Sequence, residues 1–160
     1  MADTVVLVRH GKAESGGTLL PDTARRLTEK GAALLRSWYP DAFEQLLDGE
    51  HGAEGISIWA SPAVRTMETA AIVCEVLDIP VSSIERADEL YYQDTDAILG
   101  AICNDTSRIL IVVGHNPSIE EAASELTGRV REMAKGEALC LDMAVRSDGK
   151  PTVLWDVRPW

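Results

Sequence analysis

The chain has 160 residues, the usual size of one domain, and its 46% hydrophobic and 26% charged residues are an ordinary globular composition. Its formal net charge is −11. An acidic domain repels phosphate backbones and anionic lipid, which argues against nucleic acid and membranes as partners. We therefore expect a single domain over residues 1–160, in which a site for a phosphorylated ligand would need its own cluster of cations.

The N-terminus and the cysteines indicate the compartment. No basic segment followed by a long apolar stretch opens the chain, and the apolar run Val5–Val8 is too short for a signal peptide or a membrane span. Cys74, Cys103 and Cys140 lie far apart in apolar runs, without the spacing of metal ligands. We predict buried free thiols in a reducing compartment, and hence a cytoplasmic protein.

Three short, continuous apolar runs predict strands. They are residues 5–8, 56–60 and 109–113, and the last is the most strongly apolar and β-branched. Runs that do not alternate with polar residues are typical of strands buried on both faces of a parallel sheet.

Helical patterns lie between these strands. Thr28 is a candidate N-cap for a helix that runs through Trp38. Pro40 is expected to interrupt this helix, with a second piece capped by Asp41 that holds Phe43.

Three further helices are predicted after the second strand. Ser61 and Pro62 are typical of a helix start, with serine as the cap. The stretch 95–103 has the pattern of a short helix. Ser118 is expected to open the last helix, which ends before Gly128.

The end of the chain has a different pattern. Residues 139–145 and 152–157 are strand-like, and they flank the turn-forming residues 147–150, which contain an Asp-Gly pair. The chain is therefore predicted to be an α/β protein: a three-layer sandwich with a mainly parallel central sheet, helices on both faces and a C-terminal β-hairpin.

Each predicted buried strand is followed by a polar motif. The first ends in Arg9-His10-Gly11, the second in a segment from Ser61 to Arg65, and the third in Gly114-His115. Ligands of open α/β sheets bind outside the carboxyl ends of the strands, so these motifs are expected to meet at one site.

The residue types suit phosphoryl transfer. A neutral imidazole such as that of His10 is a nucleophile that divides the transfer into two steps. Guanidinium groups donate paired hydrogen bonds to phosphate oxygens, and Arg65 lies near a helix N-terminus that favours anions. Gly11 is expected to let the backbone approach a bound oxyanion and to permit a conformation closed to other residues.

These motifs resemble the signature of the histidine phosphatase superfamily, which includes phosphoglycerate mutases and acid phosphatases. The resemblance is greatest to the short phosphohistidine phosphatases of the SixA type, and it runs in order over nearly the whole chain. It is carried by Arg9-His10-Gly11-Lys12-Ala13-Glu14, Arg25-x-Leu27-Thr28-x-x-Gly31, Ser61-Pro62-x-x-Arg65, Thr69-Ala70, Glu89-Leu90-Tyr91, Gly114-His115 and Trp155-x-Val157-x-Pro159.

The resemblance implies roles for individual residues. His10 would be the phosphorylated nucleophile, and Arg9, Arg65 and His115 would form a positive pocket around the phosphoryl group. Arg25 matches a loop arginine of the family and would reach either the substrate or the surface.

Two positions depart from the family pattern. Arg26 replaces a proline that is frequent in the subgroup, which affects the geometry of the loop. Tyr92 stands where relatives with a clear general acid carry glutamate. Glu89 is a nearby carboxylate and a possible acid, although a structural role for it is also expected.

We expect a phosphatase that acts on phosphohistidine or a related phosphomonoester, carried by a protein or a small molecule. No cofactor and no metal are expected, because the arginines and histidines can neutralise the transferring group. A mutase-like or small-molecule phosphomonoesterase activity is the alternative among enzymes. A phosphate-binding module that has lost its chemistry is the alternative outside catalysis.

Overall fold

The computed structural model describes residues 1–17, 19–144 and 148–159, which fold around one mixed sheet. Its six strands are ordered β3-β2-β4-β1-β5-β6. Their bounds are β1 (Thr4–Arg9), β2 (Ile56–Ala60), β3 (Ile84–Arg86), β4 (Ile109–Gly114), β5 (Ala138–Asp142) and β6 (Thr152–Val157). The three strands predicted from apolar runs form the centre of this sheet.

The sheet is mainly parallel. The pairs β1–β4, β2–β4 and β2–β3 are all parallel, whereas β5 is antiparallel to both β1 and β6. The predicted α/β class and the C-terminal hairpin are therefore confirmed. Residues 145–147, which include part of the predicted strand end and turn, lie outside the described residues, and β5 ends at Asp142.

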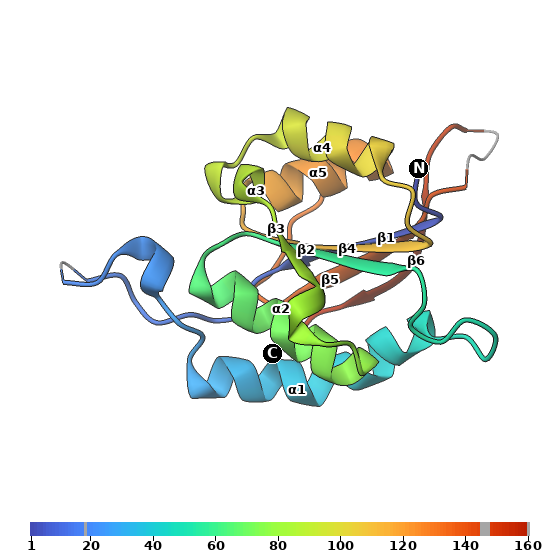
Figure 1. Cartoon of the computed structure of the whole chain (residues 1–160). Helices are drawn as coiled ribbons and strands as arrows, with labels where there is room; N and C mark the ends of the chain where they lie inside the picture. The colour runs from blue at the N-terminus through green and yellow to red at the C-terminus, as the bar shows by residue number, and fades with distance from the viewer. Residues whose placement is uncertain (18, 145–147, 160) are drawn as a thin grey trace.

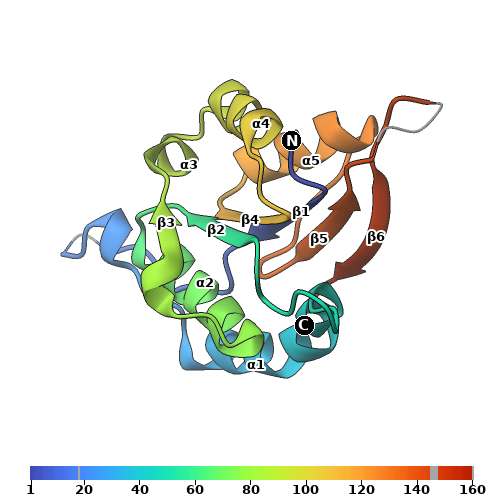
Figure 2. The same cartoon turned by 45° about the vertical axis from the view of Figure 1, so that its right-hand side comes forward.

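Helices cover both faces of the sheet, as the two views show (Figure 1 and Figure 2). On one face lie α1 (Glu29–Phe43) and α2 (Val64–Leu77), and on the other lie α3 (Asp88–Tyr92), α4 (Thr95–Asn104) and α5 (Ser118–Thr127). Short 3-10 turns complete the fold: η1 (Asp22–Ala24), η2 (Glu44–Leu46) and η3 (Val81–Ser83).

Each face of the sheet has its own apolar core. Along β1, Val6 and Val8 join the core under α1 and α2, whereas Val5 and Leu7 join the core under α4 and α5. All four side chains are fully buried. The strand is thus covered on both faces, as its continuous apolar run predicts.

The expected break at Pro40 is wrong, because this proline lies inside α1. A proline removes one helical hydrogen bond. Its neighbours Tyr39 and Phe43 are fully buried, and the Tyr39 hydroxyl donates a 2.8 Å hydrogen bond to the carbonyl of Gly136. Burial of this face of α1 outweighs the lost hydrogen bond, and the chain continues as helix up to η2.

The expected Ser61 cap is also wrong, whereas the Thr28 cap is confirmed by a 2.9 Å hydrogen bond from the Gly31 amide to its hydroxyl, and the last helix opens at Ser118 as expected. Helix α2 begins after Ala63 and α5 begins after Pro117, and neither start has a side-chain cap. Ser61 lies before α2, and its hydroxyl contacts the functional site instead.

Two of the three thiols match the expectation of burial. Cys74 and Cys140 are buried and free, whereas Cys103 is free but exposed, because it lies on the outer side of α4. Among the described residues, no helix is both long enough and apolar enough to span a bilayer.

The Gly136 backbone holds the end of β1 in place, next to the functional site. Its amide donates to the carbonyls of Arg9 and His10, at 3.0 and 2.9 Å. Its φ is +80°, and a Cβ atom added there would lie 2.8 Å from Cδ2 of Leu35. Only glycine adopts this backbone without strain and leaves room for α1.

We therefore expect Gly136→Ala to lower the free energy of unfolding by about 1–3 kcal/mol, through left-handed strain and the contact with Leu35. Gly100 is the matched control, since it lies on the exposed side of α4 with nothing within 4 Å of an added Cβ. Gly100→Ala should raise stability by about 0.5–1 kcal/mol. Urea denaturation of both variants measures the contrast, and equal effects would contradict it.

Candidate active site

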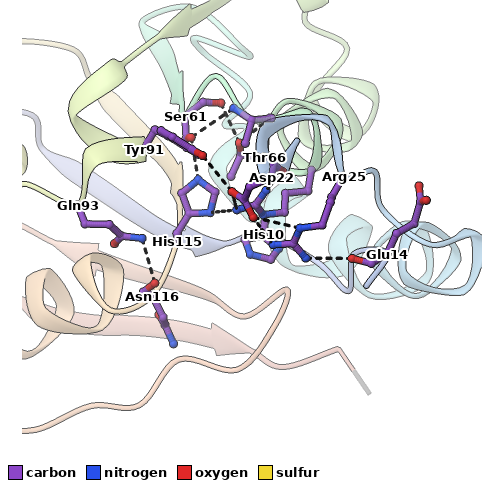
Figure 3. A network of polar contacts seen from close by, with 12 residues as sticks. His10, Glu14, Asp22, Arg25, Ser61, Thr66, Tyr91, Gln93, His115 and Asn116 are labelled. Atoms are coloured by element: carbon purple, nitrogen blue, oxygen red, sulfur yellow. Dashed lines mark hydrogen bonds and ion pairs between the residues drawn. The ribbon is translucent and has the colours of Figure 1, made fainter. Parts of the chain in front are cut away.

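The three polar motifs meet at the carboxyl ends of β1, β2 and β4 (Figure 3). The His10 amide donates to the Gly114 carbonyl at 3.1 Å, and the Ser61 amide donates to the Val113 carbonyl at 3.1 Å. The rings of His10 and His115 approach edge to face, with centroids 5.3 Å apart. The parallel register therefore brings together residues that are about 50 and 100 positions apart in the chain.

The His10 imidazole has one defined tautomer. Its Nδ1 lies 2.7 Å from the Gly11 carbonyl oxygen, which can only accept, so Nδ1 carries the hydrogen and Nε2 keeps its lone pair. Burial, together with the nearby guanidinium charges of Arg65 and Arg9, lowers the pKa of His10 to about 4, although the Gly11 hydrogen bond acts in the opposite direction. The ring is neutral at pH 7 and suited to nucleophilic attack through Nε2.

His115 has the opposite tautomer. Its Nδ1 lies 3.3 Å from Nη2 of Arg65, which can only donate, so Nδ1 accepts. Its Nε2 therefore carries the hydrogen and donates to the Ser61 hydroxyl at 2.7 Å. Burial, followed by the charge of Arg65, lowers the pKa of His115 to about 3. The site thus contains two neutral imidazoles beside arginine charges.

Arg65 supplies a buried positive charge, and Arg9 supplies a half-buried one. Arg65 projects from the first turn of α2 and is 5% exposed. Nη1 of Arg9 donates to the Met133 carbonyl at 2.9 Å. The Nε atoms of both arginines are buried and have no hydrogen-bond partner among the described residues. The protein alone does not satisfy all the donors of these two groups.

Asp22, a residue that sequence reasoning missed, is part of the same site. One carboxylate oxygen accepts from Nε and Nη2 of Arg25, at 3.1 and 2.8 Å. The other accepts from Nη2 of Arg65 at 3.1 Å and from the Tyr91 hydroxyl at 3.0 Å. These bonds, above all those from Arg25, lower the pKa of Asp22 to about 2. The carboxylate is ionised at pH 7.

Arg25 faces the site. Besides its bonds to Asp22, it donates to the Glu14 carbonyl at 2.9 Å, and its charge contributes to the lowered pKa of both histidines. This places the loop arginine, whose position the sequence left open, beside His10 and His115.

The carboxylate of Glu89 is not brought into this network. Its side chain makes no hydrogen bond and no ion pair with the part of the chain that the structure describes. The residue of α3 that reaches the site is Tyr91, whose ring centroid lies 5.8 Å from that of His115. Tyr92 is 76% exposed. Helix α3 thus contributes a hydroxyl to the site.

The special backbone conformation expected of Gly11 is wrong. Its φ is not in the left-handed region, and its amide donates to the Thr69 hydroxyl at 3.1 Å. A Cβ atom there would lie 2.9 Å from Cδ1 of Leu35. The absence of a side chain is therefore explained by close packing against α1, while Thr69 fixes the backbone that follows His10.

Comparison with known proteins places this geometry in a family. The model of the histidine phosphatase superfamily (branch 1) matches residues 5–134. The chain belongs to this superfamily. The search of curated proteins found no significant match to this chain.

Solved structures share the fold of this chain. The protein histidine phosphatase SixA, solved in complex with tungstate, is 23% identical with a TM-score of 0.76, and the match covers 98% of this chain and 97% of that one. A protein from Agrobacterium tumefaciens assigned as a SixA phosphohistidine phosphatase is 21% identical with a TM-score of 0.82, covering 99% of each chain. A similarly assigned protein from Nakamurella multipartitia is 23% identical with a TM-score of 0.72, covering 99% and 97%. At these identities the likeness establishes the fold.

The low pKa of both histidines predicts how stability depends on pH. In the unfolded chain the imidazoles take up protons near pH 6.5, whereas in the folded chain His10 and His115 stay neutral to about pH 4 and 3. Between the pKa of the unfolded chain and those of the folded chain, the unfolded state binds more protons than the folded state. The free energy of unfolding should therefore fall as the pH decreases from 6.5 to 4.5. Each histidine contributes up to about 1.4 kcal/mol per pH unit.

Chemical denaturation at several pH values measures this slope. The double variant His10→Asn/His115→Asn should give a shallower slope than the parent, because asparagine does not titrate. Parallel slopes would contradict the neutral-imidazole assignment. Nitrogen chemical shifts of the parent should show the hydrogen on Nδ1 of His10 and on Nε2 of His115.

Proposed function

We propose that this protein is a phosphatase that removes the phosphoryl group from phosphohistidine or a related activated phosphomonoester, through a covalent intermediate on Nε2 of His10. The observation that carries the proposal is the tautomer of His10. Its Nδ1 hydrogen is held by the Gly11 carbonyl, and its Nε2 lone pair is available beside Arg65 and His115.

The reaction follows from these groups in two steps. In the first, the Nε2 lone pair forms a bond to phosphorus, and the bond from phosphorus to the leaving group breaks. The ring gains positive charge, which the hydrogen bond from Nδ1 to the Gly11 carbonyl stabilises. In the second, water attacks phosphorus, the P–N bond breaks and the electron pair returns to His10, releasing phosphate.

The arginines stabilise the negative charge of the phosphoryl group in the transition state of its transfer. Arg9, Arg25 and Arg65 all act electrostatically on His10, so a phosphoryl group bound there meets three positive charges. His115 adds a further donor if it is protonated, and a dianion arriving beside it raises its pKa in that direction. Among the described residues no group of three or more His, Cys, Asp or Glu side chains could hold a metal ion.

The nucleophile can be tested by trapping the intermediate. We expect radiolabel from a phosphorylated substrate to appear on His10, stable in alkali and labile in acid. His10→Asn should abolish the label and lower kcat by at least about three orders of magnitude. The matched control is His51→Asn, an exposed histidine in the loop before β2. Label that persists in His10→Asn, or that appears on His115, would overturn the assignment.

The proposed substrate class follows from the position of Glu89, the candidate general acid, whose carboxylate lies outside the hydrogen-bond network of the site. An alkyl phosphate releases an alkoxide, which leaves slowly unless a positioned acid protonates it. Phosphohistidine releases imidazole, which holds a proton near neutral pH, and an aryl phosphate releases a stabilised phenolate. Because the Glu89 side chain makes no hydrogen bond and no ion pair with the described residues, a protein-borne phosphohistidine is the substrate that this arrangement suits best.

Free thiols support a cytoplasmic setting for this activity. Cys74, Cys103 and Cys140 are all unpaired, which is typical of a reducing compartment.

The substrate class is tested by comparing kcat/KM for phosphohistidine, an aryl phosphate, phosphoserine and 3-phosphoglycerate. We expect the first two to exceed the alkyl esters by at least about tenfold, equivalent to ~1.4 kcal/mol of barrier. Glu89→Gln should leave this order unchanged, as should the control Glu85→Gln on the exposed edge strand β3. Comparable rates on all four substrates, with loss of the alkyl esters in Glu89→Gln alone, would instead make Glu89 the acid.

A further inference from the structure

Asp22 occupies hydrogen-bond donors of Arg65 and Arg25, two of the arginines whose charges the proposed function places around the phosphoryl group. Nη1 of Arg65 donates to the Asp22 carbonyl at 2.9 Å, and Nη2 donates to its carboxylate at 3.1 Å. Both terminal nitrogens of this buried guanidinium therefore bind one acidic residue. Backbone carbonyl, carboxylate and phosphoryl oxygens all accept from these donors, so Asp22 and a phosphoryl group compete for Arg65.

The competition extends beyond Arg65. The same carboxylate accepts two hydrogen bonds from Arg25 and one from the Tyr91 hydroxyl. If a dianion took these donors while Asp22 stayed in place, the negative charge of the Asp22 carboxylate would repel it at close range. A phosphoryl group that binds the terminal nitrogens of Arg65 therefore requires Asp22 either to leave these donors or to accept a proton.

Asp22 is well placed to leave. Its side chain is 51% exposed, and η1, which carries it, contains no buried residue. The segment around η1 stands away from the body of the molecule, on the same side as the carboxyl ends of the parallel strands (Figure 1). Moving this turn exposes no core side chain, so displacement costs mainly the hydrogen bonds that the carboxylate and the backbone carbonyl of Asp22 accept.

We propose that Asp22 is a specificity-determining residue: an internal anion that must be displaced from Arg65 and Arg25 before a phosphoryl group can bind. This inference rests on the proposed function and refines it. A small anion such as inorganic phosphate gains little by exchanging one set of charged hydrogen bonds for another. A phosphoryl group attached to a protein brings additional contacts, which offset the displacement. Asp22 thereby disfavours free phosphate, the reaction product, relative to a protein-borne substrate.

The test is calorimetric binding of inorganic phosphate at pH 7.5 to the parent protein and to Asp22→Asn. Asparagine keeps the size and the acceptor oxygen but removes the charge. We expect its Kd for phosphate to fall at least about fivefold, equivalent to ~1 kcal/mol. Inhibition by phosphate should strengthen in parallel, with a lower KM for small aryl phosphates and little change in kcat.

Asp48→Asn is the matched control. Asp48 pairs with Arg108 and His51 in the loop before β2, near the amino ends of the strands, so its replacement makes the same change in net charge away from the site. Its Kd for phosphate should stay within about twofold of the parent value. If Asp22→Asn does not fold, Asp22→Ser, which also removes the charge, gives the same comparison.

Each other outcome overturns the inference. Unchanged or weaker phosphate binding in the charge-removing variants would show that Asp22 does not compete with the ligand. A loss of kcat on alkyl esters at unchanged phosphate affinity would make Asp22 a proton donor instead. Failure of the proposed function is separately visible, because it would appear as the absence of a phosphoenzyme on His10 whatever the affinity for phosphate.

Discussion

The parallel pairing of β1 with β4 is the constraint on which the rest of the site depends. It sets Arg9 opposite Gly114, and the next backbone bond, from the His10 amide to the Gly114 carbonyl, continues the register by one residue. His10 and His115 therefore leave the sheet side by side. A slip of one residue would turn every side chain of β1 to the opposite face and exchange its two cores. The apolar packing of the strand thus also fixes the approach of the two imidazoles.

Burial and charge together determine the chemistry of these imidazoles. In water each would be partly protonated near neutral pH, and a protonated ring has no lone pair for attack. Burial disfavours the charged form, and the nearby charge of Arg65 disfavours it further in both rings. Arginine keeps its own charge under these conditions because of its high pKa. A chain of net charge −11 can therefore hold a local positive pocket whose histidines remain neutral.

The sequence predicted the parts of this molecule that depend on local pattern, namely the three buried strands, the Thr28 cap and the motifs at the strand ends. It did not predict features that depend on tertiary packing. Pro40 stays helical because Tyr39 and Phe43 are buried, and β3 is an edge strand of only three residues. Asp22 lies in a segment without helical or strand periodicity, and its role comes from arginines 3 and 43 positions away. Such a partnership leaves no signal in a single sequence.

The position of Asp22 also reflects a conflict between stability and binding. Arg65 and Arg25 would repel each other in a pocket without a counter-charge, and the desolvation of a buried guanidinium is offset only by good acceptors. Asp22 supplies those acceptors, so it stabilises the folded pocket for the same electrostatic reason that it opposes an incoming anion. A protein that concentrates positive charge for a dianion must neutralise it when no dianion is bound. An exposed carboxylate on a short turn meets this need, because it holds the arginines in place and can still be displaced.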